Sequence, residues 1–244
     1  MSRIIKISAT TSTNDHLRAL NQQGFVRDGD TVLTYNQTAG KGQQGALWHY
    51  EQGKSLAFSV FRNFEAVSWD HQFFVNFSVC LAIKNAFVAL DIPKVFIKWP
   101  NDILADSKKV CGVLVENKIQ PNGNYNSIIG VGVNVNNEQF LALPKASSLK
   151  LQTGVHYNLD EVFHSIRNAM EATMIQLRAG NLKSLKAAYE EVLFKKDTPA
   201  AFKTSNGTIF SGMIVGASNA GTLQIALEDG SLKEFQQKEI QLLY

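Results

Sequence analysis

A short glycine-rich segment contains the residue types that bind anions. Gly40, Gly42 and Gly45 lie within six residues, and the cation Lys41 stands between the first two. Glycine allows positive φ and a close approach of the backbone to a ligand, and such loops can turn successive N–H groups toward an anion. From residues 37–48 alone, a loop that folds over a phosphate or carboxylate and an ordinary surface loop are equally good interpretations.

Other segments add polar side chains and glycines of the kind that line ligand sites: Ser12-Thr13-Asn14, Lys98-Trp99-Pro100-Asn101-Asp102, Lys109 with Gly112, and Gly130-Val131-Gly132-Val133-Asn134. Two lysines, several backbone donors and one carboxylate suit an anionic substrate with a metal-bound nucleotide. Lysine neutralises charge that develops on a phosphate, and aspartate can position Mg²⁺ or an attacking amine. For Ser12-Thr13-Asn14, a helix N-cap without any ligand is the simpler interpretation when no other context is considered.

Several common motifs are excluded. The glycines of residues 37–48 match Gly-x-Gly-x-x-Gly, but that dinucleotide fingerprint must open a helix, and here a strand-like segment follows. The sequence contains neither a P-loop nor a Gly-x-Ser-x-Gly elbow. The five histidines lack metal-ligand spacing, so no protein metal site is expected. Cys80 and Cys111 lie in apolar segments without Cys-x-x-Cys spacing, which predicts buried thiols in a reducing cytoplasm.

Composition limits the class of protein. The chain has 244 residues, of which 45% are hydrophobic and 18% charged, as expected for one large globular domain with a small one. No apolar run approaches the ~20 residues of a membrane span, and the first residues do not resemble a signal peptide. A net charge of +3 is too small to indicate a nucleic-acid partner. A cytoplasmic protein that binds neither membrane nor nucleic acid is expected.

The elements that position these segments follow from apolar periodicity. Strands are predicted at residues 2–9, 31–35, 55–61, 95–99, 109–116 and 127–135, and helices between residues 12 and 24 and at 68–90, 160–177 and 182–194. The remaining residues show short strands separated by turns rich in Asn, Gly and Asp, which is typical of a small β-barrel. We therefore predict an α+β domain at residues 1–196 and a β-barrel at residues 197–244.

The motifs together resemble one family closely. Lys98-Trp99-Pro100-Asn101-Asp102-Ile103, then Lys109-x-x-Gly112, then Gly130-Val131-Gly132-Val133-Asn134 look like the signature of biotin protein ligases. Ser12-Thr13-Asn14 and residues 37–48 match the other two motifs of that family in order and separation, so the resemblance covers nearly the whole chain. It implies a mixed β-sheet domain with packed helices, the class II synthetase-like biotin/lipoate ligase fold, followed by a small SH3-like β-barrel.

The resemblance also implies a two-step reaction. Biotin, ATP and Mg²⁺ give biotinyl-5′-AMP, and a lysine of a biotin carboxyl carrier protein, from acetyl-CoA carboxylase or a related carboxylase, then takes the biotin. Catalysis would depend on Lys109, Lys41 and Asp102. Biotin would contact Ser12, Thr13, Asn14, Gln37, Gly40, Lys41, Gly42, Gln43, Lys109, Gly112, Gly130 and Val133. ATP and the adenylate would contact Lys41, Gln43, Trp48, Asn101, Lys109 and Asn134.

The chain departs from the family pattern in two places. Many members carry an N-terminal helix-turn-helix, whereas here the first motif begins about ten residues from Met1, so DNA binding is not expected. The family loop usually contains Gly-Arg-Gly-Arg-x-Gly-Arg, and here Lys41, Gln43 and Ala46 replace the three arginines. Lysine lacks the bidentate fork of arginine and glutamine lacks its charge, which predicts weaker retention of the adenylate.

Two other functions stay open at this point. A lipoate or octanoate ligase or transferase shares the fold and the carrier-lysine chemistry, although the Lys-Trp-Pro-Asn-Asp turn favours biotin. A non-catalytic biotin sensor belongs to a different class, and Lys109 argues against it because binding biotin alone needs no second cation at the carboxyl end. A homodimer is also possible, and the sequence does not decide it.

Overall fold

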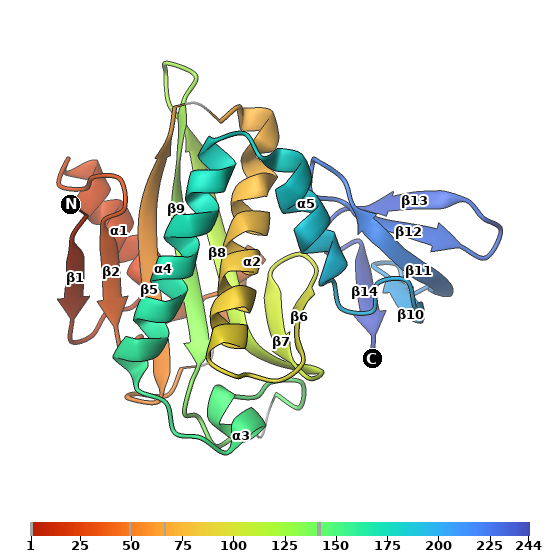
Figure 1. Cartoon of the computed structure of the whole chain (residues 1–244), viewed down its shortest axis with the longest axis horizontal. Coiled ribbons are helices and arrows are strands. Elements are labelled where there is room, and N and C mark those ends of the chain that lie inside the picture. The colour runs from red at the N-terminus through yellow and green to blue at the C-terminus, as the bar shows by residue number, and fades with distance from the viewer. Residues whose placement is uncertain (1, 49, 66, 141–142) are drawn as a thin grey trace.

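The computed structural model describes residues 2–48, 50–65, 67–140 and 143–244, so one of the histidines, His49, lies outside the described residues (Figure 1). A seven-stranded sheet with helices on its faces forms the larger part of the molecule. A five-stranded sheet near the C-terminus forms the smaller part, beside α5 and β6 (Figure 1). The α+β class predicted from the sequence is confirmed.

The large sheet is mixed and has the order β1-β2-β5-β9-β8-β7-β6. Only β1 (Ile4–Ile7) and β2 (Thr31–Thr34) are parallel neighbours, and α1 (Thr13–Gln22) connects them. The other neighbours are antiparallel: β5 (Ser55–Phe64), β9 (Tyr125–Asn134), β8 (Lys108–Ile119), β7 (Asp102–Ala105) and β6 (Val95–Lys98). Such a sheet can bury both faces, because antiparallel hairpins and a parallel crossover coexist in it.

The two faces of the large sheet carry different helices. The long helices α2 (Gln72–Ala89) and α4 (Leu159–Arg178) cross one face, with α5 (Leu182–Glu191) beside them (Figure 1). On the other face, Leu17 of α1 packs in a separate small cluster with Val32, Phe61 and Ile128. Side chains alternate between faces along a strand, so Val32 faces away from α2 whereas its neighbour Leu33 belongs to the main core on the α2 side.

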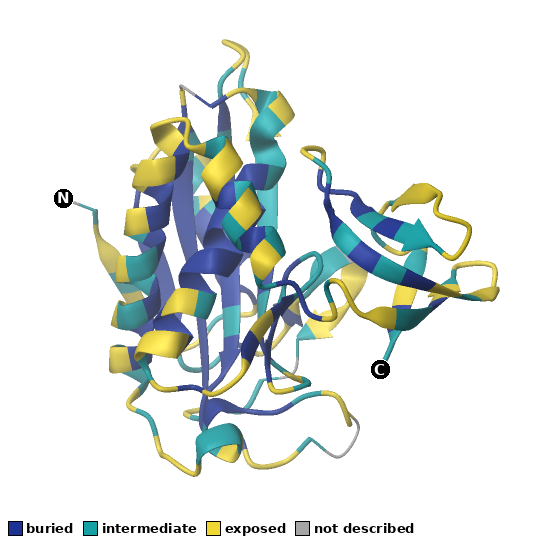
Figure 2. Ribbon diagram, turned by 45° about the vertical axis from the view of Figure 1, so that its right-hand side comes forward, coloured by how far each residue is buried: buried dark blue, intermediate teal, exposed yellow. Residues whose placement is uncertain are grey.

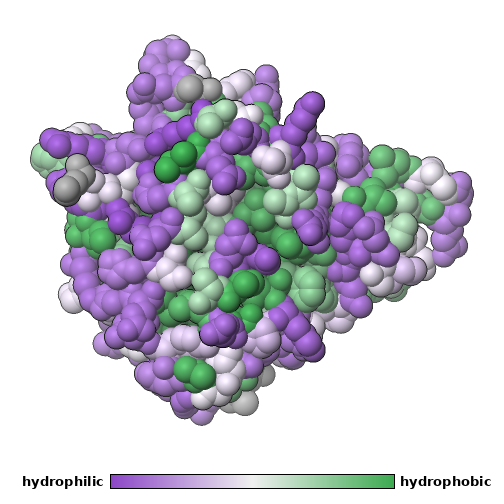
Figure 3. Space-filling view, in the orientation of Figure 1, coloured by the Kyte–Doolittle hydropathy of each residue, from purple (hydrophilic) through white to green (hydrophobic). Residues whose placement is uncertain are grey.

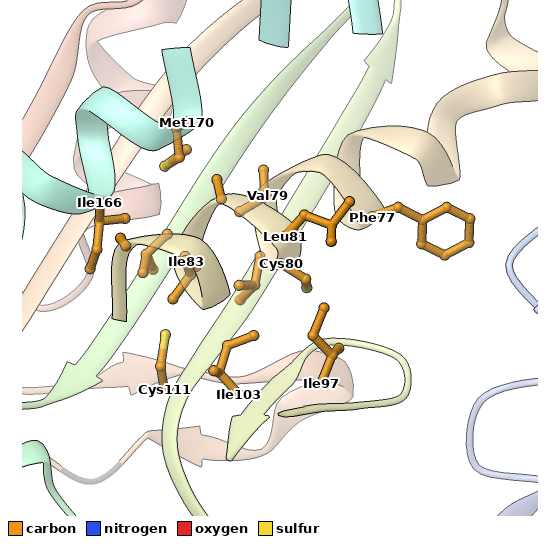
Figure 4. Packing of buried hydrophobic residues seen from close by; sticks show 14 of the residues in the cluster. Phe77, Val79, Cys80, Leu81, Ile83, Ile97, Ile103, Cys111, Ile166 and Met170 are labelled. Carbon is orange, nitrogen blue, oxygen red and sulfur yellow. The ribbon is translucent and has the colours of Figure 1, made fainter. Parts of the chain in front are cut away.

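Helix α2 is apolar on all sides because it is the centre of the core. Residues Trp69–Ala89 are long and apolar enough to cross a membrane by length and composition, but most of them are buried in the protein. Figure 4 shows Val79, Cys80 and Ile83 of α2 among side chains from the strands and from α4. Cys80 and Cys111 are both free and buried, as predicted, and burial raises the pKa of both thiols.

The exposure of the residues differs between the large sheet and the helices that cover it. Figure 2 shows the strands of the large sheet as buried and the outward surfaces of the covering helices as exposed. On the helix-covered face, hydrophobic residues gather near the middle and hydrophilic residues surround them (Figure 3). Asn158 caps helix α4, because its side chain accepts hydrogen bonds from the N–H groups of Asp160 and Glu161.

The second sheet is antiparallel, with the order β13-β12-β11-β10-β14. Its strands are β10 (Pro199–Thr204), β11 (Ile209–Ala217), β12 (Leu223–Leu227), β13 (Leu232–Phe235) and β14 (Ile240–Leu243). Its first strand begins close to the boundary predicted at residue 197. Among the described residues no pairing joins the outer strands β13 and β14, so the structure gives a β-sheet domain without showing the closed barrel.

Specific contacts fix the second sheet against the first domain. The Trp99 indole Nε1 donates a hydrogen bond to the Gly221 carbonyl at 3.0 Å, and the Ala217 N–H donates to Glu190 Oε1 at 2.9 Å. Gly221 has φ of +83° and lies against the Phe73 ring, so this position requires glycine both for its backbone and for its space. These contacts hold the second domain beside the Lys98–Asp102 turn.

Strand ends differ from the sequence prediction at the β8–β9 hairpin. The pairing continues to Ile119 and Tyr125, whereas the prediction ended at residue 116 and began at residue 127. Two of the added pairs, Asn117 with Ser127 and Lys118 with Asn126, are polar. Apolar alternation therefore does not reveal them, and the ladder extends because the hairpin brings both backbones together.

Candidate active site

A cavity of about 660 Å³ lies on the face of the large sheet that α2 does not cover. The sheet forms its floor, the glycine-rich loop covers one side, and residues of β10, β14 and the β13–β14 connection close another side. Three sequence motifs that are far apart in the chain, Ser12-Thr13-Asn14, Lys98-Trp99-Pro100-Asn101-Asp102 and Lys109 with Gly112, all line it. The structure thus brings together most of the residues that the sequence singled out.

The floor of the cavity is a row of small residues in adjacent strands. Ala57 of β5 pairs with Gly132 of β9, Gly132 pairs with Gly112 of β8, and Gly112 pairs with Asp102 of β7. A Cβ atom at Gly132 would lie 2.7 Å from Trp48 Cε2, and one at Gly112 would lie 2.9 Å from Trp48 Cζ3. The Trp48 indole therefore rests directly on the two glycines, at a distance that no larger residue allows.

Uncharged polar groups meet at one end of the cavity. Ser12 caps α1 by accepting from the Asp15 N–H, and it also lines the cavity. The Thr13 N–H donates to Gln37 Oε1 at 2.9 Å. The buried Ser59 hydroxyl lies 2.7 Å from Thr13 Oγ1 and 2.5 Å from Asn14 Oδ1. Ser59 was missed by sequence reasoning because a lone serine in an apolar strand carries no local signal.

Charged groups meet at the other end. The Lys109 ammonium lies 2.6 Å from Asp102 Oδ1, and the Lys98 ammonium lies 3.5 Å from Asp102 Oδ2. Lys109 Nζ also lies 5.3 Å from the centre of the Trp48 ring, which is within cation–π range. The backbone of Lys109 is held by the Lys145 carbonyl at 2.7 Å and by the Ser147 N–H at 2.9 Å.

The turn that carries Asp102 is anchored from the core. The Pro100 carbonyl accepts hydrogen bonds from Asn76 Nδ2 at 2.7 Å and from the Tyr189 hydroxyl at 2.9 Å. The Asn101 amide donates to the Val113 carbonyl, so Asn101 supports the site while also lining the cavity. These buried hydrogen bonds fix the backbone of the turn and so the position of the carboxylate.

The cavity is strongly cationic. Among the described residues that line it, Asp102 is the only carboxylate, and the lysines are Lys41, Lys98, Lys109, Lys203 and Lys238. Lysines in a partly enclosed cavity attract and stabilise anions such as phosphates. Lys203 and Lys238 come from the second domain, and the sequence did not point to them because isolated surface lysines are common there.

The glycine-rich loop is ordered by its own hydrogen bonds. β3 (Gly40–Lys41) pairs with β4 (Leu47–Trp48) around a short 3₁₀ turn, Gln43–Gly45. The Gly42 N–H donates to Ala46, and the Ala46 N–H donates to Gln43, so these two amides are directed within the loop and not toward an anion. The Lys41 ammonium pairs with Asp15 of α1 at 2.6 Å.

Three predicted ligand residues do not line the cavity. Gly40 pairs with Trp48 in the short hairpin and positions that side chain. The Val133 side chain lies in the hydrophobic core on the α2 face, because strand alternation turns it away from Gly132, so the expectation that it lines the biotin slot is corrected to Gly132. Asn134 donates to the Ser147 carbonyl at 3.0 Å and thereby supports the segment that holds Lys109.

Within the described residues no group of three or more His, Cys, Asp or Glu side chains is arranged to hold a metal ion. A divalent ion that enters with a nucleotide is usually held through phosphate oxygens and one or two carboxylates, and Asp102 is the carboxylate that the cavity offers.

Comparison with known proteins gives consistent matches. Residues 7–134, more than half of the chain, match the family model described as the Biotin/lipoate A/B protein ligase family. The bifunctional ligase/repressor BirA of Bacillus spizizenii is 27% identical over 241 residues, which cover 97% of this chain and 72% of that protein. A biotin–[acetyl-CoA-carboxylase] ligase of Mycobacterium tuberculosis is 30% identical over 179 residues, which cover 72% of this chain and 65% of that protein.

The fold is also found among solved structures. The biotin protein ligase of Aquifex aeolicus, solved in complex with biotin and ATP, superposes with a TM-score of 0.81 and 26% identity over 100% of this chain and 99% of that one. The likeness includes the second domain as well as the catalytic sheet, since both chains are covered almost completely. This chain belongs to the biotin/lipoate A/B protein ligase family.

Proposed function

We propose that this chain is an ATP-dependent biotin–protein ligase. The observation that supports this most is one cavity that joins an uncharged polar end, formed by Ser12, Thr13 and Asn14, to a lysine-rich end over a glycine floor. Biotin has a polar ureido edge, an apolar body and a carboxylate, and this cavity offers matching groups in the same order. The structural relative from Aquifex aeolicus was solved with both biotin and ATP.

In the first step, a biotin carboxylate oxygen attacks the α-phosphate of ATP, and pyrophosphate leaves. Lys109 lines the lysine-rich end of the cavity, and there it would reduce the repulsion between carboxylate and α-phosphate and stabilise charge that develops on the phosphate oxygens. Lys98 adds positive charge at the same end, and Lys41 lines the cavity from the glycine-rich loop, where it pairs with Asp15. Trp48 offers an aromatic face to the adenine, and Asp102 is the carboxylate that would help to hold a Mg²⁺ ion bound to the nucleotide, which would neutralise phosphate charge.

In the second step, the amine of a carrier lysine attacks the carbonyl carbon of biotinyl-5′-AMP. A C–N bond forms, the C–O bond to the phosphate breaks, AMP leaves with that electron pair, and the amine loses a proton. Asp102, between Lys98 and Lys109, is the carboxylate that positions the incoming amine. The glycine-rich loop covers the mixed anhydride, which water would otherwise hydrolyse.

The carrier is the biotin carboxyl carrier domain of acetyl-CoA carboxylase or of a related carboxylase. The support is that relatives from Mycobacterium tuberculosis and Paracoccus denitrificans are named biotin–[acetyl-CoA-carboxylase] ligases. The chemistry requires a lysine on an exposed turn of the carrier, since only an extended side chain reaches Asp102 inside the cavity.

Biotin-dependent exchange of pyrophosphate into ATP tests the first step, and transfer of labelled biotin to a carrier domain tests the second. A ligase shows both. A folded protein that binds biotin without exchange would be a sensor, and exchange that depends on lipoate or octanoate instead of biotin would assign the chain to the other branch of the family. Either result overturns the proposal.

A further inference from the structure

The side-chain amide of Asn14 has a defined orientation in the cavity. Asn14 is 4% exposed, and its Nδ2 donates a hydrogen bond to Glu116 Oε2 at 2.6 Å. Its Oδ1 accepts from the Ser59 hydroxyl at 2.5 Å. A Cβ atom at Gly130 would collide with the same Oδ1, so this oxygen lies over the glycine that lines the polar end of the cavity.

Glu116 determines which end of the amide faces the cavity. An ionised carboxylate only accepts hydrogen bonds, so the Asn14 atom next to it must be the nitrogen. A reversed amide would place Oδ1 against the carboxylate oxygen, where two acceptors repel. Ser59 is compatible with either arrangement because its hydroxyl both donates and accepts, so Ser59 does not fix the orientation.

Glu116 is itself held in place by charge. The Arg18 guanidinium on α1 donates to Glu116 Oε2 at 2.6 Å and also pairs with Asp15. Asp15 in turn pairs with Lys41 of the glycine-rich loop. Desolvation by itself raises the pKa of Asp15, but hydrogen bonds from Lys41 and Arg18 outweigh it and hold this pKa below its usual value. The carboxylate next to Asn14 therefore belongs to a network that connects β8, α1 and the loop.

We propose that Glu116 is a positioning residue that selects ligands carrying an N–H group. It holds the Asn14 amide with the oxygen toward the cavity, so the polar end presents an acceptor. A carbonyl oxygen has two lone pairs, so Asn14 Oδ1 can accept from the Ser59 hydroxyl and from a ligand N–H at the same time. This inference rests on the proposed function, since the ureido ring of biotin supplies such N–H groups.

The same arrangement disfavours the other substrates of the family. Lipoate and octanoate have no N–H at the end opposite the carboxylate, so they would leave the buried Asn14 oxygen without a ligand partner. A site that hydrogen-bonds a substrate group rejects an analogue lacking it more strongly than a hydrophobic pocket rejects a change of size. Glu116 thus contributes to discrimination without touching the ligand.

The test compares biotin with an analogue in which oxygen replaces a ureido N–H, by calorimetric binding to the native protein, Glu116→Gln and Glu116→Ala. We expect the native protein to prefer biotin by at least about tenfold, a preference that falls severalfold in Glu116→Ala. Glu116→Gln retains an acceptor and should keep part of it. Lys118→Ala, two positions along β8, is the matched control and should behave as native.

The ratio of the two affinities distinguishes an orienting role from a structural one, because a general loss of fold weakens both ligands alike. Thermal unfolding of each variant verifies that it is folded. A folded Glu116→Ala variant with the native ratio would overturn this inference while leaving the ligase proposal intact. Failure of the native protein to bind biotin would overturn both.

Discussion

Lys109 and Gly112 face the same cavity although they are three positions apart along one strand. In a regular strand this spacing places two residues on opposite faces. Here the β7–β8 ladder shifts register, since Ile103 pairs with Cys111 but Leu104 pairs with Lys109, and Val110 is the extra residue. Val110 and Cys111 are both buried, and a Cβ atom at Gly112 would lie 3.3 Å from Lys109 Cε. The bulge turns Lys109 toward the ligand, a common use of bulges beside active sites.

Lys109→Ala is expected to abolish adenylate formation without unfolding the protein. The Lys109 side chain is 34% exposed and its partner Asp102 is 19% exposed, so loss of the ion pair should change the free energy of unfolding by less than about 1 kcal/mol. Pyrophosphate exchange and thermal unfolding measure the two effects. Lys108→Ala removes the neighbouring lysine, which does not line the cavity, and serves as the control. Normal exchange in Lys109→Ala would remove this residue from its assigned role.

Gly132→Ala should change substrate binding and Val133→Ala should change stability, because these neighbours face opposite sides of the sheet. An added methyl group at Gly132 would displace the Trp48 ring and raise the KM for ATP or biotin, with little loss of stability. Removing two buried carbons at Val133 should lower the free energy of unfolding by about 2 kcal/mol and leave KM near native. Kinetics and urea unfolding of both variants test this. Equal effects would mean that the glycine row does not form the floor.

Much of this site could be predicted from sequence motifs, but the side of the sheet toward which each residue points could not. Apolar alternation correctly predicts the central strands, and the motif order brings Ser12, Gln37 and Lys109 to one cavity. The bulge at Val110 and the choice of Gly132 over Val133 depend on register, which a single strand does not encode. Glu116 and Ser59 were missed because their importance arises only from contacts with Asn14, a residue distant in the chain.

Trp99→Phe should weaken ATP binding more than biotin binding. Phenylalanine keeps the ring but removes the Nε1–H that donates to the Gly221 carbonyl, a hydrogen bond that contributes about 1 kcal/mol to docking of the second domain. Looser docking displaces Lys203 and Lys238 from the cavity, while the polar end is built from the first domain only. Separate KM values for ATP and biotin measure this, with Trp69→Phe as the control. A rise confined to biotin would contradict the assignment.

Asp28→Asn should destabilise the protein in a pH-dependent way. Desolvation by itself raises the pKa of Asp28. Hydrogen bonds from Arg178 and Asn63 and the charge of Arg62 outweigh it and lower the pKa from its ordinary value of 3.8. A lowered pKa stabilises the folded state above the unfolded pKa, and this contribution disappears as the pH falls below 3.8 through the folded pKa. The Asp28 side chain is 38% exposed, so solvent screening limits the effect to about 1 kcal/mol.

Urea unfolding of the native protein and Asp28→Asn at neutral pH and at about pH 3 checks this expectation. The difference between the two proteins should be present at neutral pH and should shrink at the acidic pH, where protonation of Asp28 in the unfolded chain begins to remove this contribution. A difference that is independent of pH would show that the carboxylate charge does not contribute and that Asp28 acts only through its shape.

Gln43→Arg should slow the release of biotinyl-5′-AMP. Gln43 lies between the main cavity and an adjoining one of about 370 Å³, and its Oε1 is buried without a hydrogen-bond partner among the described residues. Arginine would add a charged fork that can bind the adenylate phosphate in two places, which is worth about tenfold in release rate. Gln176→Arg adds the same charge on the exposed side of α4 and is the control. If both variants release the adenylate at the native rate, the loop retains its ligand through Trp48 and the backbone, and the missing arginines are compensated there.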